Sequence, residues 1–251
     1  MPLSDLHGVN GSSYLERDYL GLGLLDLGER TVEFYKAEIA RQYAEKIGHP
    51  LVAGGLHIVP ADFSEINTHL PNQFAALKPL MADNIKQSVM AGIRVLIMPN
   101  ITLHETIDQL EPALMRGLKI IHPVLASVRR LQAEKVKAIT LIASGYSSTS
   151  PRLAQYFNQH DIAIIRPSTE HIACIDEIRK NTYLGKETDE NKKTYHRLIT
   201  HYQQSSPVVV ACTELSLLLN AKAIDTVFDT ARLQIEAALE ACILSTNAES
   251  L

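Results

Sequence analysis

The sequence predicts an α/β protein in which helices cover both faces of parallel β-sheets. Short apolar segments alternate along the chain with longer segments whose apolar residues recur at helical spacing. Several short segments are apolar at nearly every position, residues 208–211 and residues 93–98 (in which Arg94 is the one charged residue) among them, which is typical of parallel strands buried on both faces. Eight or so such strands in 251 residues allow either a (β/α) barrel or two smaller doubly wound sheets.

The expected strands are short apolar runs bounded by charged or turn residues. The first follows a charged lead-in, and the second alternates only weakly between apolar and polar positions. In chain order the strands are residues 20–25, 51–59, 93–98, 118–121, 138–143, 162–165, 208–211 and a last short run at 226–228.

The expected helices carry apolar residues every three or four positions. The first, residues 29–48, ends at Gly48 and Pro50, and the second, residues 74–92, ends in glycine. A proline opens the helix at 151–159. The remaining helical segments are 102–115, 124–135, 172–184 and 192–204, with a polar joint at 185–191, and residues 215–220 and 231–244 finish the chain.

Two strand-and-turn segments occur twice along the chain. The segment VLIMPNITL resembles VVVACTELS, and alignment of their strands places Asn100 opposite Cys212. The segment LLDLGERT likewise resembles LIASGYSST, with Gly28 opposite Gly145. A duplication of this kind favours two similar α/β halves that face each other.

Composition limits the class of protein. Hydrophobic residues make up 46% of the chain and charged residues 21%, which excludes a disordered chain. The formal net charge of −4 argues against nucleic-acid binding. No apolar run approaches the ~20 residues that span a bilayer, and residues 1–17 contain no signal-peptide core. Three widely spaced cysteines form neither a metal motif nor a disulfide framework, so we expect a reduced, cytoplasmic protein that contacts no membrane.

The polar turns after the strands hold the candidate catalytic and binding residues, because ligands bind at the carboxyl ends of parallel strands. These turns lie at residues 26–31, 99–104, 144–149 and 212–214. Ser144, Ser147, Ser148 and Thr149 form the densest hydroxyl cluster, which suits either helix capping or carboxylate binding. Asp62 follows another strand and is either a helix cap or a cleft residue. The chain has no Walker loop, dinucleotide motif or Ser-His-Asp order.

Cys212 joins a buried strand to the start of a helix. The helix N-terminus is expected to lower the pKa of the thiol, so that it acts as a base or nucleophile near neutral pH; the alternative is a small apolar packing residue. Cys174 and Cys242 lie on apolar helix faces and are expected to pack in the core. His104 lies either in the same turn as Asn100 or on a helix surface.

Six segments together resemble the aspartate/glutamate racemase superfamily. VVVACTELSLLL and the later VFDTARLQIEAAL are similar to its C-terminal signature, in which a strand leads to Cys-Thr-Glu and a Phe-Asp-Thr segment opens the last helix. GERTVEFYKAEI resembles the first-helix motif, ADFSEI an acidic strand end, and ASGYSST a glycine turn. RVLIMPNITLHET occupies the place of the first catalytic turn. The resemblance covers residues 19–245.

This resemblance implies two α/β domains with parallel sheets and an active site at their interface, rather than a barrel. It implies a first domain of residues 19–117 plus 227–251, a second of residues 118–226 that carries Cys212, and an extension at residues 1–18. It also implies a homodimer without cofactor or metal. The implied catalytic residues are Cys212, Asn100 and His104. The implied substrate-binding residues are Thr31, Asp62, Thr102, Ser144, Tyr146, Ser147, Thr213 and Glu214.

The chain departs from the family pattern at the first catalytic turn. Asn100 replaces the first catalytic Cys or Thr, and Ile101 replaces an Asn, whereas Thr102 and His104 match. Leu24-Leu25-Asp26 replaces a glycine-rich turn, and Gln234 stands where some members have His. The expected function is PLP-independent racemisation or epimerisation next to a carboxylate, on aspartate or glutamate, with Cys212 as thiol acid/base. The alternatives are a single-cysteine decarboxylase or isomerase of a small dicarboxylate, and a degenerate carboxylate-binding protein.

Overall fold

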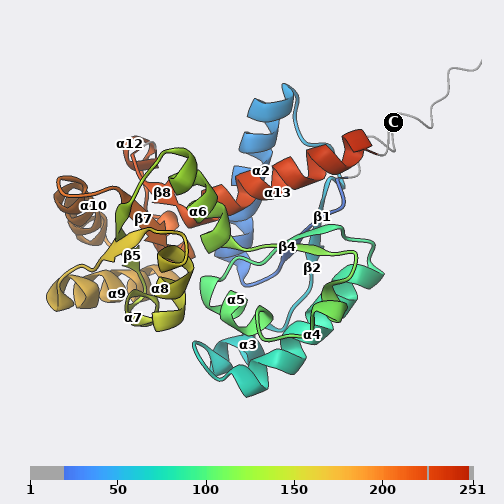
Figure 1. Ribbon diagram of the computed structural model, residues 1–251, viewed down its shortest axis with the longest axis horizontal. Helices are drawn as coiled ribbons and strands as arrows, with labels where there is room; N and C mark the ends of the chain where they lie inside the picture. The colour runs from blue at the N-terminus through green and yellow to red at the C-terminus, as the bar shows by residue number, and fades with distance from the viewer. Residues whose placement is uncertain (1–19, 225, 249–251) are drawn as a thin grey trace, which may run out of the picture.

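The computed structural model describes residues 20–224 and 226–248. The extension predicted at residues 1–18 lies outside the described residues. The chain forms two four-stranded parallel sheets with helices on both faces of each, so the predicted doubly wound α/β class is confirmed and the barrel is excluded (Figure 1).

The first sheet has the strand order β2-β1-β3-β4. Its strands are β1 (Leu22–Leu25), β2 (Leu56–Val59), β3 (Val95–Ile97) and β4 (Lys119–Ile121). Leu24 and Ile97 point to one face and pack under α2 (Glu29–Ile47) and α13 (Thr230–Ala248). Leu25 and Leu96 point to the other, under α3 (Phe63–His69), α4 (Phe74–Met90) and α5 (Ile101–Ile107). This alternation explains why the two central strands, β1 and β3, carry no polar side chain.

The second sheet repeats that order as β6-β5-β7-β8. Its strands are β5 (Ala138–Ala143), β6 (Ala163–Ile165), β7 (Val208–Ala211) and β8 (Phe228–Asp229). One face packs against α6 (Pro123–Ala133) and α8 (Pro151–Asn158), and the other against α9 (Thr169–Tyr183), α10 (Asp189–Gln203) and α11 (Thr213–Ser216). The short helices α7 (Gly145–Thr149) and α12 (Ala221–Ile224) complete the half. The repeated order agrees with the sequence repeat, because β1 matches β5 and β3 matches β7.

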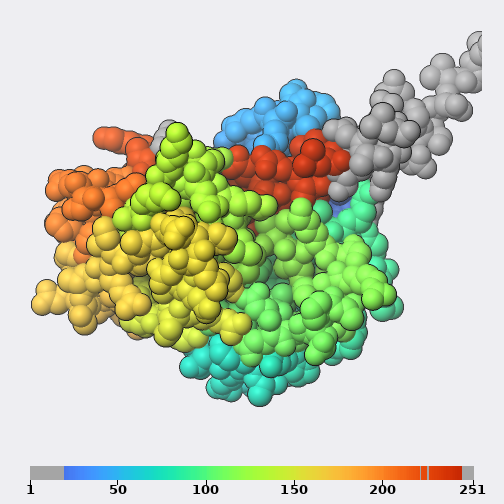
Figure 2. Space-filling model, in the orientation of Figure 1, coloured from blue at the N-terminus to red at the C-terminus, as the bar shows by residue number. Residues whose placement is uncertain are grey.

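The chain crosses between the halves twice. It leaves the first sheet after β4 through α6, and it returns after β8 through α13, which packs against both α6 and α2 (Figure 1). The space-filling view shows the two halves in direct contact (Figure 2). Strand pairing places β4 in the first sheet and β8 in the second, and the predicted domain limits at 117/118 and 226/227 stay a prediction.

Several predicted boundaries are wrong. The helix predicted at 102–115 ends at Ile107, and a separate 3₁₀ turn, η1 (Pro112–Met115), follows. Pro112 causes the break, since the residue before a proline, here Glu111 with ψ 125°, is held extended. The strand predicted at 51–59 begins only at Leu56, after a turn that includes Gly54 at φ +88°. The short helices α3 and α7 were not predicted.

Candidate active site

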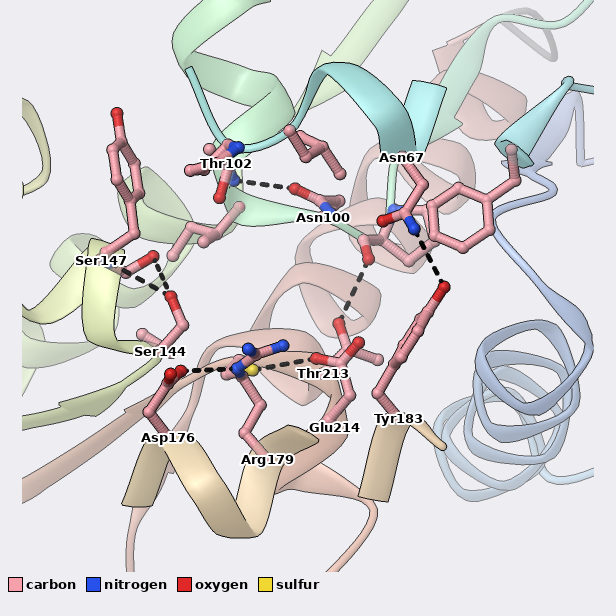
Figure 3. A pocket seen from close by; sticks show the side chains of 18 residues that line it. Asn67, Asn100, Thr102, Ser144, Ser147, Asp176, Arg179, Tyr183, Thr213 and Glu214 are labelled. Carbon is pink, nitrogen blue, oxygen red and sulfur yellow. Dashed lines mark hydrogen bonds and ion pairs between the residues drawn. The ribbon is translucent and has the colours of Figure 1, made fainter. Parts of the chain in front are cut away.

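A cavity of about 330 Å³ lies between the two halves, at the carboxyl ends of strands from both sheets (Figure 3). From the first half it is lined by Phe63, Asn67, Leu70, Pro71, Pro99, Asn100, Ile101 and Thr102. From the second half it is lined by Ser144, Tyr146, Ser147, Asp176, Arg179, Tyr183, Ala211, Cys212, Thr213 and Glu214. Opposed strand ends bring together turns that are more than one hundred residues apart in the chain.

Cys212 is the partly exposed residue at the N-cap of α11, directly after the buried strand β7. Its thiol donates to Glu214 Oε2 over 2.9 Å. Burial raises the pKa of Cys212 well above its usual value, and the Glu214 carboxylate raises it further; a backbone bond and Arg179 oppose this only in part. The expectation of a lowered thiol pKa is therefore wrong. The helix has only four residues, so its dipole is weaker than the adjacent negative charge.

Asn100 lies on the opposite wall, at the N-cap of α5. Its side-chain Oδ1 accepts from the backbone N–H of Thr102 at 2.9 Å and of Leu103 at 3.1 Å. Only the oxygen of an amide side chain can accept hydrogen bonds from two N–H groups, so these bonds assign the Oδ1 and Nδ2 atoms of Asn100. The Nδ2 group makes no hydrogen bond to any residue in the described part of the chain and is left as a donor at the cavity wall.

Thr213 joins the two halves next to the cavity. Its hydroxyl donates to the carbonyl oxygen of Pro99 over 3.2 Å, which ties the start of α11 to the turn before α5. A second small cavity, lined by Asn100, Cys212 and Thr213 among others, adjoins this contact. Asn100 and Cys212 thus line the same space from opposite halves.

The serine cluster is partly a capping arrangement. Ser144 caps α7 by accepting from the N–H of Ser147, and it also donates to the hydroxyl of Ser147 over 3.0 Å. Tyr146 lines the cavity and donates to Glu105 Oε2 over 3.2 Å. Glu105 is only 6% exposed and also accepts from Ser150. Burial and this carboxylate raise the pKa of Tyr146.

Three of the predicted site residues do not line the cavity. His104 is 1% exposed, forms a hydrogen bond with the carbonyl oxygen of Met98 over 3.1 Å and packs against the tilted ring of His122, so the structure places it in the core. Burial lowers the pKa of His104 to about 4. Asp62 caps α3 by accepting from the N–H of Glu65, and Thr31 lies in the first turn of α2.

The charged pair Asp176 and Arg179 on α9 is not among the site residues that the sequence predicts. Asp176 accepts from Gly145 N at 2.9 Å and from Arg179 Nε at 2.8 Å, and both side chains line the cavity. Burial opposes the charge on Asp176, but these bonds keep its pKa below the usual value. The signal in the sequence was an acidic and a basic residue three positions apart on a helix, which is too common to single out. Nearer the protein surface, Asn67 donates to the hydroxyl of Tyr183 and links α3 to α9.

Gln234, which stands where some family members have histidine, ties together the strand ends below the cavity. It is fully buried, accepts from the Tyr35 hydroxyl and donates to the carbonyl groups of Met98 and Ile121. No cluster of three potential metal ligands occurs among residues 20–224 and 226–248. Within the same ranges no helix is long and apolar enough to cross a bilayer.

Comparison with known proteins adds the following similarities. A family model described as Asp/Glu/hydantoin racemase matches residues 24–238. A putative Asp/Glu racemase from Yersinia pestis has a similar structure, with a TM-score of 0.75 and 22% identity over 88% of this chain and 98% of that one. An aspartate racemase homologue from Pyrococcus horikoshii OT3 has a TM-score of 0.71 and 18% sequence identity, over 88% of this chain and 98% of that one. The aspartate racemase of Picrophilus torridus has a TM-score of 0.67 and 14% sequence identity, over 90% of this chain and 93% of that one. No curated protein matches the chain in sequence.

Proposed function

Because this chain belongs to the Asp/Glu/hydantoin racemase family, we propose that it is a PLP-independent, racemase-like enzyme that moves a proton at a carbon next to a carboxylate. Its substrate is a small acidic amino acid, aspartate or glutamate, bound in the cavity between the halves. The observation that carries the proposal is the bond between the Cys212 thiol and Glu214 on the cavity wall.

Cys212 and Glu214 act as one acid/base unit. The raised pKa keeps the thiol protonated at neutral pH, so it is an acid at rest. To act as a base, Cys212 passes its proton to the Glu214 carboxylate, which already accepts it, and the thiolate then takes the α-proton of the substrate. The electron pair of the broken C–H bond moves into the substrate carboxylate as an enediolate, which Asn100 Nδ2 and the hydroxyl groups can stabilise.

Among the described residues, the first half of the protein supplies no second acid/base to this cavity. Its lining residues are apolar side chains, two amides and the hydroxyl of Thr102, none of which titrates near neutral pH. Asn100 in particular has no ionisable proton. The proposed chemistry is therefore one-sided, since Cys212 removes and returns the proton on the same face, and inversion at the carbon is slow.

This asymmetry also favours a second candidate, decarboxylation of a small dicarboxylate. When both carboxylates are attached to one carbon, loss of one as carbon dioxide leaves the electron pair of the broken C–C bond in the other as an enediolate. This step needs no base, and only one acid is needed to protonate the carbon. Asn100 opposite Cys212 fits that requirement, because a neutral wall accommodates departing carbon dioxide better than a second thiolate.

The proposal is tested by NMR of aspartate, glutamate and small dicarboxylates with the protein in D2O. Exchange of the α-proton by the unmodified protein, abolished in Cys212→Ser and retained in Cys174→Ser, is the expected result. Cys174 is the matched control because it lies on α9 but does not line the cavity. Release of carbon dioxide without exchange supports the second candidate, and neither reaction with any of these compounds contradicts both.

A further inference from the structure

Arg179 is the one positively charged residue among the described residues on the cavity wall. Among the described residues that line the cavity, the charged side chains are Asp176, Glu214 and Arg179. The Arg179 side chain extends from α9 toward the Cys212–Glu214 pair (Figure 3). A lone guanidinium in a cavity that otherwise carries carboxylates is the group that an anionic ligand would meet first.

Only one edge of the Arg179 guanidinium is used by the protein. Its Nε donates to Asp176 Oδ1 over 2.8 Å, and Asp176 is its one ion-pair partner among the described residues. Asp176 is itself held by the N–H of Gly145 and by Lys180 Nζ at 3.2 Å. The two terminal nitrogens of Arg179 donate to no group in the described part of the chain. They form a fixed, end-on pair of donors with the geometry of a carboxylate.

We infer that Arg179 binds the carboxylate attached to the carbon that loses its proton. The inference rests on the proposed function for the identity of that carbon, but not for the binding itself. Arg179 Nη1 and Nη2 donate to the two carboxylate oxygens while Asp176 holds Nε. The ligand class is a small α-amino carboxylate, and any second carboxylate lies against the uncharged donors of the helix starts.

The position of Arg179 beside the thiol decides between the two carboxylates of an acidic amino acid. For proton transfer the α-carbon must lie within about 3.5 Å of the sulfur. The α-carboxylate is one bond from that carbon, whereas the side-chain carboxylate is two or three bonds away. A cation that lines the same wall as Cys212 and Glu214 therefore meets the nearer one. Charge that develops on the enediolate then falls on the carboxylate that Arg179 already holds.

The test compares four ligands with three proteins by isothermal titration calorimetry. The ligands are aspartate, asparagine, which keeps only the α-carboxylate, isoasparagine, which keeps only the side-chain carboxylate, and succinamide, which keeps neither. The proteins are the unmodified chain, Arg179→Gln and Lys180→Gln. Lys180 is the matched control because it follows Arg179 on α9, also pairs with Asp176 and does not line the cavity. Asp176 keeps the Gly145 N–H in both variants, and circular dichroism verifies that each variant is folded.

Arg179→Gln is expected to weaken binding of aspartate and asparagine by roughly 10- to 100-fold, the loss typical of a hydrogen-bonded charge. Its affinity for isoasparagine should change little, and Lys180→Gln should bind all ligands as the unmodified protein does. Equal losses for asparagine and isoasparagine, unchanged aspartate affinity in Arg179→Gln, or no binding of aspartate and asparagine to the unmodified protein would overturn the inference. Arg179-dependent binding without α-proton exchange would instead overturn the proposed function and leave the binding role of Arg179 standing.

Discussion

The thiol of Cys212 lies 2.9 Å from Glu214 Oε2 and donates its proton to that carboxylate. Cys212 is the N-cap of α11 and Glu214 lies in the first turn of that helix, so the pair is local and requires no domain closure to form. The adjacent negative charge disfavours the thiolate, and the thiol is the resting form at neutral pH. This pair makes Cys212 an acid whose base form depends on Glu214.

The first prediction concerns thiol reactivity. Glu214→Gln removes the charge that helps to raise the pKa of Cys212, so the thiolate fraction at pH 8 increases. Alkylation of Cys212 by iodoacetamide should accelerate by about three- to fourfold for each unit by which the pKa falls, because the thiolate fraction rises about tenfold while the nucleophilicity of the thiolate decreases. Peptide mapping by mass spectrometry measures the rate. Cys174 is the internal control, and an unchanged or slower rate at Cys212 would show that Glu214 does not hold the thiol in its neutral form.

The second prediction concerns the missing second acid. Asn100→Cys places a thiol opposite Cys212 and should raise the rate of aspartate or glutamate racemisation relative to α-proton exchange. A general acid/base typically contributes about 10²–10⁴-fold, which sets the expected gain where Ile101 leaves room for productive geometry. Chiral chromatography measures racemisation, and Asn100→Ser, which supplies a hydroxyl without an accessible pKa, is the control. If both variants racemise equally slowly, the opposite wall is not where the second proton is exchanged.

The third prediction concerns the buried carboxylate behind Tyr146. Glu105 accepts from Tyr146 and Ser150 across the two halves, and Ser150 is only 5% exposed. Glu105→Ala should lower the free energy of unfolding by about 1–3 kcal/mol, because it leaves the Ser150 hydroxyl without this acceptor. Tyr146→Phe, which removes one bond at the cavity edge, should cost less. Urea denaturation compares the two, and equal losses would contradict a special role for the buried Ser150 contact.

The fourth prediction concerns pH-dependent stability. Burial lowers the pKa of His104 to about 4 and, together with His104, that of His122 to about 2. Below the usual histidine pKa of about 6.5 the unfolded chain takes up protons that the native state does not, so stability falls as pH falls. Between pH 7 and pH 5 the loss is about 2 kcal/mol for each ring.

Urea denaturation at pH 7 and pH 5 measures this loss. The variant His104→Gln should lose about 2 kcal/mol less than the unmodified protein over the same interval, since one titrating group is gone. An unchanged pH dependence would mean that the His104 ring is already accessible to protons in the native state.

The sequence predicted those features that depend on local pattern. Uniformly apolar runs predicted the buried strands, and hydroxyl or thiol side chains directly after them predicted Ser144, Ser147 and Cys212 on the cavity wall. The repeat predicted the matching strand orders of the two sheets. These signals are local because the carboxyl end of a parallel strand always faces the same edge of its sheet.

The missed features depend on tertiary packing. Arg179 lies three turns into α9, and the packing of α9 against α7, α11 and β5 brings it to the cavity. The prediction that His104 belongs to the site is wrong because of its position around the helix. His104 follows Thr102 by two residues on α5, which is a rotation of about 200°, so its side chain points into the core and not into the cavity. The sequence mispredicts the pKa of Cys212 because the Cys-Thr-Glu spacing does not reveal that the Glu214 carboxylate contacts the thiol.

The central claim, that Cys212 works on one face of the substrate without a second acid/base, is tested most directly by proton NMR in D2O with each enantiomer of aspartate and glutamate. The ratio of α-proton exchange to racemisation is measured for the unmodified protein. The account predicts that one enantiomer exchanges its α-proton much faster than it racemises, and that the other exchanges slowly. Exchange and racemisation at equal rates would contradict it, because they require a second group that returns the proton to the opposite face.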